Sequence, residues 1–242
     1  MCLLRWVIAT VFAVASGICC AVTDRALAAP PDDATFLFFG GTDLWRYGDF
    51  LYGGAIWAPA GVDNSGFTLK GLISGGWYKY TSGALNADIK GTMMSAAILP
   101  GWKFVSGKLI VSLYVGPVVQ DYRLSPNDPG ARLHGLYLGG QFAADIWYEP
   151  TSFSMISVNG ALASIGPTGS LRVALGTRLL DLMFIGPETE EIWCGNFEEY
   201  QFGLHITALR TDKLEWSAAS GIAFTSDHRD GPYFRIGANT KY

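Results

Sequence analysis

Charge is scarce in this sequence. Only 16% of its 242 residues are charged, whereas soluble globular domains usually carry about 25%. That fraction leaves too few charged side chains to cover a fully wetted exterior. The formal net charge of −4 also supplies no attraction for the phosphates of nucleic acid, which would need a basic patch, so we set that partner aside.

Cysteine is absent from most of the chain. Cys2, Cys19 and Cys20 all lie close to the N-terminus, and Cys194 is the remaining one of four. A single thiol cannot form an internal disulfide. In an oxidising compartment the fold therefore needs another source of stability, and a closed hydrogen-bonded barrel supplies one.

After the N-terminus, the chain has no apolar run long enough for a membrane-spanning helix. The N-terminus itself has Arg5, an apolar segment over 6–20 and the small-x-small sequence 26–28. This order predicts a signal peptide over 1–28 that is cleaved after Ala28. A transmembrane anchor is the alternative, but the apolar run is shorter than the ~20 residues that a span needs. Neither cysteine near its end has the sequence context of a lipoprotein site.

Signatures of catalysis and of metal binding are also missing. The sequence has no Gly-x-Ser-x-Gly elbow, phosphate-binding loop or Cys-x-x-Cys pair. His134, His205 and His228 are far apart, and no second ligand lies near them at metal-site spacing. We therefore expect no metal and no cofactor, and a structural or surface role for each histidine.

Glycine (30 residues) and aromatic side chains (14%) are abundant, and apolar residues alternate with polar ones. In 134–148, Leu136, Leu138 and Phe142 share one face, whereas Gln141 and Asp145 lie on the other. Period-two patterning of this kind predicts strands, and segments of ~9–11 residues suffice to cross a bilayer. A soluble β-sandwich or a lipocalin-like barrel would alternate as well.

Three further features favour an outer-membrane barrel over these soluble folds. Many alternating segments exceed the ~5–6 residues typical of globular strands. Their polar faces are rich in Gly, Ser, Gln and Tyr and poor in Lys and Glu, as expected of a lumen. Aromatic residues lie near predicted strand ends, where interfacial girdles form, and the chain ends on Tyr242. The tryptophans expected in these girdles are Trp45, Trp57, Trp77, Trp102, Trp147 and Trp216.

Turn residues divide the chain after the signal peptide into eleven candidate strands. They span 35–44, 49–58, 66–80, 88–100, 108–121, 132–148, 152–164, 170–184, 199–210, 214–225 and 232–242. Bacterial single-chain barrels normally have an even number of strands, so one boundary is wrong, and the stretch 165–198 is the least certain. Glu188, in this stretch, is expected beside a turn, where it would hold a loop or contact a ligand. We predict an all-β, antiparallel transmembrane β-barrel over 29–242 with twelve strands, or else ten.

The hairpin around residue 212 permits more than one register. A two-residue turn at Thr211-Asp212 would mix apolar and polar residues on each face. A three-residue loop over 211–213 pairs Arg210 with Leu214 and Phe202 with Ile222, which makes one side continuously apolar. Because a slip of one residue reverses the faces, we predict the three-residue loop.

This register places His205, Thr207, Glu215 and Ser217 together on the lumen side. A histidine beside a serine, oriented by a carboxylate, is the arrangement of nucleophilic hydrolysis. An outer-membrane lipid or glycan hydrolase using His205, Ser217 and Glu215 is therefore one alternative function. Ser217 is only diagonal to His205, however, and barrel lumens are polar in any case, so we expect a protein that is not an enzyme.

Glycan handling requires aromatic side chains interleaved with amides and charges. The lumen-facing residues that fit this description are Tyr137, Gln141, Asp145, Arg172, Arg178, Gln201, Tyr233, Arg235 and Asn239. They fit equally well a plugged polar interior, whose donors and acceptors must satisfy one another. The sequence leaves both interpretations open.

Short motifs occur along the chain in a characteristic order. They are Phe38–Gly41, Tyr52–Gly54, Gly75–Tyr78, Gly116-Pro117, Ser125–Pro129, Trp147 with Pro150, Gly186–Glu188, Gly195-Asn196, Tyr200 with Phe202-Gly203, and Gly231–Phe234. Each motif alone is a turn signature of low specificity. In this order, over nearly the whole chain after the signal peptide, the sequence resembles the BcsS family of cellulose biosynthesis proteins. The resemblance implies an outer-membrane β-barrel that is linked to cellulose production, and it implies no catalytic residues.

The expected function and partners follow from this resemblance. We expect the barrel to assist cellulose biosynthesis and export by supporting or anchoring the secretion apparatus, and passage of glucan stays open for a barrel of ten or twelve strands. Outer-membrane lipid, cellulose and cellulose secretion proteins are the expected partners, in exopolysaccharide and biofilm formation. A hydrolase and a small-solute pore remain as alternatives.

Overall fold

The structure is a computed structural model that describes residues 34–242 except 167 and 195–196. The signal peptide predicted over 1–28 lies outside the described residues. None of the described residues forms a helix that is long and apolar enough to cross a membrane.

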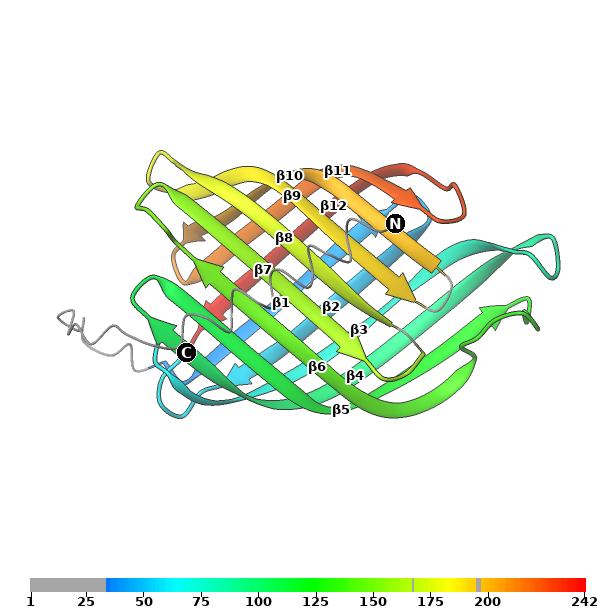
Figure 1. Cartoon of the computed structure of the whole chain (residues 1–242), viewed down its shortest axis with the longest axis horizontal. Helices are drawn as coiled ribbons and strands as arrows, with labels where there is room; N and C mark the ends of the chain where they lie inside the picture. The colour runs from blue at the N-terminus through cyan, green and yellow to red at the C-terminus, as the bar shows by residue number, and fades with distance from the viewer. Residues whose placement is uncertain (1–33, 167, 195–196) are drawn as a thin grey trace. The chain divides into compact units, whose positions relative to one another are not determined.

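Twelve antiparallel strands close into one barrel (Figure 1). The strands are β1 (Phe36–Trp45), β2 (Gly48–Trp57), β3 (Gly66–Ser82), β4 (Ala87–Ser106), β5 (Leu109–Ser125), β6 (Gly135–Tyr148), β7 (Ser154–Ala163), β8 (Thr168–Leu179), β9 (Met183–Cys194), β10 (Phe197–Thr211), β11 (Leu214–Thr225) and β12 (Gly231–Lys241). Each strand pairs with its neighbour in sequence, and β1 pairs with β12. The amide of Phe36 donates to the carbonyl of Tyr242 at 2.8 Å, and the amide of Tyr242 donates back at 2.8 Å. The predicted fold and the preferred strand number are confirmed.

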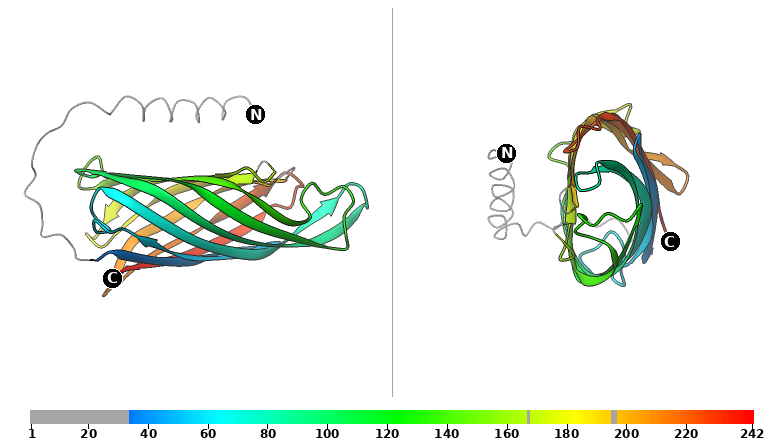
Figure 2. Two further views of the ribbon diagram at one scale, coloured as in Figure 1. Left: turned by 90° about the horizontal axis from the view of Figure 1, so that it is seen from below. Right: turned by 90° about the vertical axis from the view of Figure 1, so that its right-hand side faces the viewer.

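The two ends of the barrel differ. The proximal end holds Phe36 and Tyr242, together with the connection 58–65 between β2 and β3. The distal end is opposite, and there β3, β4 and β5 extend furthest and the connection 126–134 joins β5 to β6. Seen from the distal end, the strands enclose an oval opening (Figure 2, right).

The outer surface is apolar, as the alternation predicts. Leu136 and Leu138, on the face expected to point outward, are highly exposed, Leu138 to 77%. On β4, Thr92 and Trp102 lie at the two ends of an outward-facing apolar stretch; they are ten positions apart, or about 33 Å at ~3.3 Å per residue. A strand tilt of about 40° reduces this to roughly 25 Å, the usual height of the lipid-facing band.

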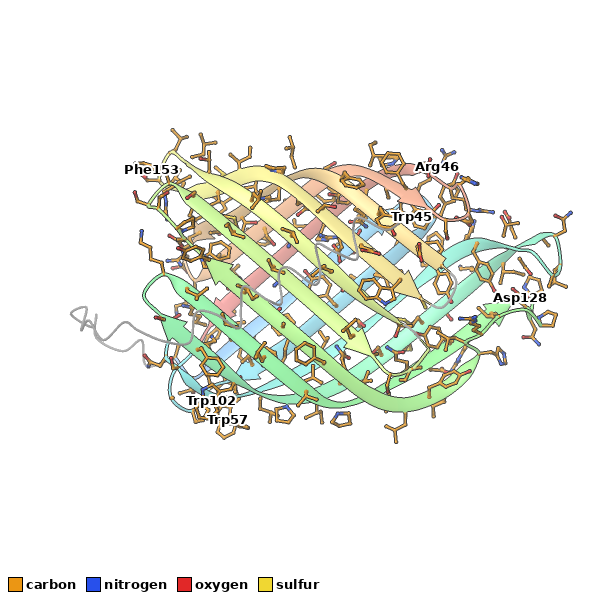
Figure 3. All side chains as sticks on the ribbon, in the orientation of Figure 1. Trp45, Arg46, Trp57, Trp102, Asp128 and Phe153 are labelled. Carbon is orange, nitrogen blue, oxygen red and sulfur yellow. The ribbon has the colours of Figure 1, made fainter. Side chains whose placement is uncertain are left out.

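Of the six predicted girdle tryptophans, four lie on the outward faces of their strands (Trp57, Trp77, Trp102 and Trp216) and two point inward. Trp57 and Trp102 are exposed at the proximal end (Figure 3), where each contacts a neighbouring phenylalanine ring at a centroid distance of 6.4 Å. Trp45 is only 8% exposed and packs inside against Tyr47 and Phe197. The inward position of Trp147 brings its ring to 5.8 Å from Phe184. The girdle prediction was wrong for these two because nearness to a strand end does not determine the face.

The uncertain stretch 165–198 contains the strand that the turn-based division missed. The predicted strand 170–184 runs over β8 and into a turn at Leu180 and Asp181, which have φ angles of 52° and 56°, and the missed strand, β9, follows this turn. No glycine or proline marks the turn, and Asp181 alone is a weak signal. Glu188 consequently lies within β9, and its predicted place beside a turn is wrong.

The β10–β11 hairpin has the predicted register over most of its length. Phe202 pairs with Ile222, as expected. Arg210, however, pairs with Glu215 and not with Leu214, because the register shifts between Ile206 and Leu209. Ala208 lies in this bulge with a φ of 62°, and the extra residue shortens the loop to a two-residue turn at 212–213. The predicted register is therefore confirmed in the barrel wall, whereas the predicted three-residue loop is wrong.

Candidate functional site

The barrel interior holds a network of ion pairs centred on Arg235. This guanidinium on β12 contacts Asp43 on β1 at Nη2–Oδ2 2.6 Å and Gln201 on β10 at Nη2–Oε1 2.7 Å. It also forms ion pairs with Glu188, at Nη1–Oε1 3.5 Å, and with Glu190. Both glutamates are on β9, which two strands separate from β12. The network therefore links strands across the lumen as well as along the wall.

Glu188 is the most deeply buried carboxylate of this network, with a side chain that is 0% exposed. Arg172 donates to it from Nε at 2.9 Å and from a second guanidinium nitrogen, and the hydroxyl of Tyr233 donates to it at 2.8 Å. A buried charge is tolerable only when it is paired and hydrogen-bonded. These donors meet that requirement from β8 and β12.

Glycines make room for the tyrosines beside this network. A Cβ on Gly203 would lie 2.4 Å from the Tyr233 hydroxyl and 2.3 Å from the carbonyl oxygen of Ser220. A Cβ on Gly41 would lie 2.5 Å from the hydroxyl of Tyr52. Only glycine at these inward positions lets the tyrosine side chains lie across the wall and reach the charged groups.

A second polar group lies nearer the proximal end. Lys70 of β3 contacts Asp145 of β6 at 2.8 Å, and the side-chain amide of Asn159 donates to the same carboxylate at 3.1 Å. The ammonium of Lys70 also lies over the rings of Tyr114, at 4.9 Å, and Phe39, at 5.6 Å. These contacts cross-link β1, β3, β5, β6 and β7 inside the barrel.

The connection 58–65 contributes to the proximal end of the interior. Val62 is buried, and its carbonyl accepts a hydrogen bond of 2.5 Å from Lys103. Asp63 forms an ion pair with Lys241 at 2.6 Å. Since Lys103 and Lys241 occupy inward positions on β4 and β12, the connection lies against the lumen side of the wall.

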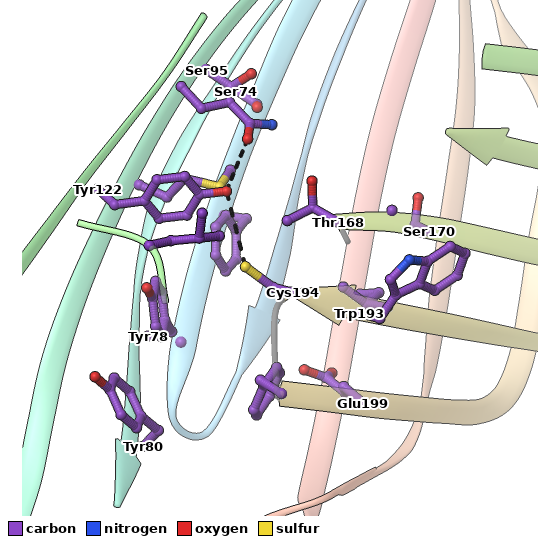
Figure 4. A pocket seen from close by; sticks show the side chains of 18 of the residues that line it. Ser74, Tyr78, Tyr80, Ser95, Tyr122, Thr168, Ser170, Trp193, Cys194 and Glu199 are labelled. Atoms are coloured by element: carbon purple, nitrogen blue, oxygen red, sulfur yellow. Dashed lines mark hydrogen bonds between the residues drawn. The ribbon is translucent and has the colours of Figure 1, made fainter. Parts of the chain in front are cut away.

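The distal half of the lumen contains a cavity of about 740 Å³ (Figure 4). Its floor is part of the charged network, through Asp43, Glu190, Gln201 and Arg235. Its wall carries aromatic side chains from five strands, namely Trp45, Phe50, Tyr52, Tyr78, Tyr80, Tyr122 and Phe197. Amides and hydroxyls lie between them, namely Ser74, Ser95, Gln120, Gln141 and Ser170.

Three of these aromatic rings follow one another along the wall. The rings of Phe50 and Tyr78 have centroids 6.5 Å apart and planes 14° apart, and those of Tyr78 and Tyr80 are 6.1 Å and 25° apart. We call this row the aromatic track. On β5, two strands further round the wall from β3, the Tyr122 hydroxyl donates to Gln120 at 3.0 Å and lies 3.9 Å from the sulfur of Cys194 (Figure 4).

The connection 126–134 is held at the distal mouth by Asp128. Its carboxylate accepts hydrogen bonds from the hydroxyls of Tyr80, at 2.8 Å, and Ser82, at 2.9 Å, and from the amide of Gly130, at 2.9 Å. Burial opposes ionisation, but these hydrogen bonds outweigh it and lower the pKa of Asp128 below its ordinary value. Asp128 is therefore ionised when it holds the connection 126–134. We call its three hydrogen bonds the distal latch.

The nine residues predicted to face the lumen do so, and the structure divides them into groups. Gln141, Gln201 and Arg235 line the distal cavity. Arg172 and Tyr233 contact Glu188 just outside that lining.

The other four predicted residues lie towards the ends or the proximal half. Asp145 belongs to the Lys70 group. Arg178 pairs with Glu149 at 3.1 Å, and the amide of Asn239 lies 3.5 Å from Glu215. The hydroxyl of Tyr137 bonds to the backbone of His134 at the distal end.

The proposed hydrolytic group does not assemble. Nε2 of His205 lies 3.0 Å from the carbonyl oxygen of Leu175, which can only accept, so this nitrogen carries the proton. Nδ1 lies 3.0 Å from the hydroxyl of Thr207 and accepts from it. Among the described residues, no hydrogen bond joins Ser217 to His205, and Glu215 instead accepts from Arg210 at 3.1 Å.

Sequence reasoning missed Asp43, Glu190 and Lys70 as members of the interior. All three are charged residues at inward positions of strands in which polar and apolar residues alternate. A charged residue at such a position was the sequence signal from which their place in the interior could have been predicted. No group of three or more His, Cys, Asp or Glu side chains in the described part of the chain has the geometry of a metal site.

One family model matches most of this chain. The family model described as cellulose biosynthesis protein BcsS matches residues 37–242. The chain belongs to the BcsS family. No curated protein matches the sequence of this BcsS family member.

Several solved outer-membrane barrels are similar to it in fold. The KdgM porin is 11% identical with a TM-score of 0.43, and the match covers 85% of this chain and 99% of the porin. The transport unit of the autotransporter AIDA-I from Escherichia coli is 10% identical with a TM-score of 0.45, covering 97% of each chain. The TodX deltaS2S3 mutant monoaromatic hydrocarbon channel is 10% identical with a TM-score of 0.48, covering 88% and 90%. These likenesses concern the barrel and carry no inference about function.

Proposed function

We propose that this BcsS family protein is an outer-membrane barrel that supports cellulose secretion by holding a segment of glucan in its distal cavity, without catalysing a reaction. The observation that carries the proposal is a cavity with an aromatic track on its wall and a charged floor. The distal end faces the cell exterior in this proposal, because outer-membrane barrels place their longer connections outside. The predicted signal peptide over 1–28 is removed during export.

The lining of the cavity suits a β-linked glucan. A sugar ring has an apolar face, which packs on aromatic rings, and equatorial hydroxyls, which need hydrogen-bond partners. Phe50, Tyr78 and Tyr80 supply the rings, while Gln120 and Gln141 supply donors and acceptors. Ligand sites of this kind are concave, mostly apolar and completed by a few polar groups.

The charged residues at the floor of the cavity favour binding of a glucan segment over passage of a glucan chain through the barrel. A chain that crossed the lumen would have to separate Arg235 from its carboxylate partners and Lys70 from Asp145. Breaking a buried ion pair costs several kcal/mol, so the cross-linked interior opposes transit. A supporting role in which the glucan enters and leaves by the distal mouth has no such cost. The same floor argues against a small-solute pore.

The binding test uses the full mature barrel in detergent micelles. Cellohexaose is titrated by isothermal calorimetry into the wild type and into the double variant Phe50→Ala/Tyr78→Ala. We expect the double variant to bind at least about tenfold more weakly, since aromatic contacts dominate such sites. Phe67→Ala, which removes an outward ring, is the matched control and should bind as the wild type does. Equal affinity in all three proteins contradicts the proposal.

Three further measurements complete the test. Deletion of the gene should reduce extracellular cellulose or alter its fibres, and unchanged cellulose with normal fibres contradicts a role in secretion. Intact-mass analysis of the protein from outer membranes should give a chain that begins at Ala29. In planar bilayers the wild type should give no steady conductance, whereas persistent open-channel currents would favour the pore.

A further inference from the structure

An exposed group of cations lies on the outer surface near the distal end. Lys79 of β3, Lys90 of β4 and Arg123 of β5 all point outward from neighbouring strands. We call these residues the distal cation patch. Lys79 is paired directly with Lys90, and Arg123 is paired with Thr92, one outward position from Lys90.

The pairing of Lys79 with Lys90 is unfavourable by itself. Like charges directly opposite each other destabilise a pair of strands. Among the described residues neither lysine forms an ion pair; both ammonium groups lie over the Trp77 ring, at 5.8 and 5.2 Å. The nearby carboxylates have other partners: Asp121 pairs with Arg123 of the patch at 2.9 Å, Asp49 accepts from the Trp77 indole at 3.0 Å, and Asp88 forms an ion pair with Arg229. The two lysines thus lack an anion that the protein itself supplies.

The patch begins where the apolar surface ends. On β3 the outward residues change from Ile73 to Trp77 and then Lys79, and on β4 from Met94 to Thr92 and then Lys90. Trp77 is therefore at the distal membrane interface, where indole rings concentrate. The lysines lie just beyond it, at the level of lipid headgroups.

A hollow lies in the apolar surface of the same strands, six residues from the lysines towards the proximal end, or about 20 Å along a strand at ~3.3 Å per residue. Its volume is about 630 Å³, and it extends over β1 to β5. Small outward residues, namely Gly53, Ala55, Gly71 and Ala96, leave the space, and larger apolar side chains such as Ile73, Ile98 and Val119 border it. Three of the strands that form the hollow, β3, β4 and β5, also carry the patch.

We propose that the distal cation patch and this hollow together bind one phosphorylated, multiply acylated glycolipid of the outer leaflet. The phosphates lie between Lys79, Lys90 and Arg123 and relieve the repulsion between the two lysines, while acyl chains fill the hollow. Anionic lipid headgroups attract basic residues at the membrane surface in this way. The inference rests on the proposed outer-membrane location with the distal end outside.

The test uses the mature barrel in dodecylmaltoside micelles with hexa-acylated diphosphoryl lipid A as the probe. Native mass spectrometry measures the fraction of barrel that retains the lipid. The double variant Lys79→Gln/Lys90→Gln should lose at least about tenfold in affinity, and Lys79→Arg/Lys90→Arg should keep it. The matched control is Lys108→Gln/Lys213→Gln, which removes two exposed lysines at proximal turns and should bind as the wild type does.

A second variant and a competitor separate the two parts of the site. Ala96→Phe fills the hollow and should weaken binding of the six-chain lipid. Inorganic phosphate in excess should displace the lipid only weakly, because it lacks acyl chains. Full displacement by phosphate, or equal binding by all variants, overturns the proposal.

Failure of the lipid proposal can be distinguished from failure of the glucan proposal, because one variant is tested for both ligands. Lys79→Gln/Lys90→Gln should bind cellohexaose as the wild type does, because its substitutions lie outside the lumen. Loss of lipid binding with intact glucan binding supports the lipid site. If this variant still binds the lipid, the result contradicts the proposed lipid site and does not affect the glucan proposal.

Discussion

Lys70 on β3 and Asp145 on β6 meet inside the barrel at an Nζ–Oδ2 distance of 2.8 Å, although β4 and β5 separate their strands. Their side chains are 13% and 33% exposed. The contact ties the wall together across the lumen, in addition to the hydrogen bonds between neighbouring strands. The stability of the barrel should therefore depend on side chains inside it.

A double-mutant cycle on Lys70→Met and Asp145→Asn should show this dependence directly. Each single change leaves a partly buried partner without its counterion, so the coupling energy should be about 1–3 kcal/mol. The free energy of unfolding is measured by urea titration in lipid vesicles, followed by tryptophan fluorescence. Additive effects of the two changes would show that the pair contributes nothing beyond the separate side chains.

Arg235→Ala should destabilise the barrel more strongly. The change leaves Asp43, Glu188 and Glu190 close together without their shared cation, and removing one partner of a buried pair costs about 3–5 kcal/mol. The same urea titration measures the effect. Arg123→Ala is the control, because that side chain is 80% exposed and its removal should change stability by less than about 0.5 kcal/mol. Equal effects of the two changes would contradict the central role of Arg235.

Gly203→Ala should also destabilise the barrel, by about 1–3 kcal/mol. The added Cβ meets the backbone oxygen of Ser220 at 2.3 Å and the Tyr233 hydroxyl at 2.4 Å, so Tyr233 must withdraw from Glu188. Gly140→Ala is the matched control, because a Cβ there meets nothing within 4 Å. The shift in midpoint of thermal unfolding compares the two variants, and equal shifts would exclude the steric explanation.

The distal latch should open in acid. Hydrogen bonds lower the pKa of Asp128 in the folded state, so its contribution is present above the ordinary carboxyl pKa of about 3.9 and is lost as the pH falls through the lower folded value. Hydrogen exchange should show that the amides of 130–133 are protected, relative to their intrinsic exchange rates, at pH 7 and lose this protection at about pH 2.

Asp128→Asn is the companion variant for this measurement. It should lower the protection of the amides of 130–133 at pH 7 and abolish the difference in protection between the two pH values. Exchange in β6 serves as the internal reference, since the strand ladder does not depend on this carboxylate. Protection in 130–133 that is unchanged in acid and in the variant would show that other contacts hold the connection.

Period-two alternation made the wall of this barrel predictable. Successive side chains of a strand point to opposite faces, so Leu138 was expected outside and Gln141 and Asp145 inside before any pairing was known. The register of Phe202 with Ile222 followed from the same rule. The family resemblance, carried by turn motifs in order, also came from the sequence.

Local irregularities escaped prediction because they depend on individual backbone angles. The turn at Leu180 and Asp181 has no glycine to mark it, and the bulge at Ala208 places an alanine at positive φ. Such conformations persist only where the surrounding structure imposes them. Composition at a strand end likewise could not decide whether Trp45 faces lipid or lumen.

Alternation along the chain was enough to predict long amphipathic strands and the lumen-facing side of most of them, and the ordered motifs were enough to predict the family. Which of the inward residues meet followed only from the folded barrel. Arg235 reaches Glu188 and Lys70 reaches Asp145 only after twelve strands have closed with one tilt and one stagger. The physical reason is that facing is a property of each strand, whereas contact across a lumen is a property of the closed ring.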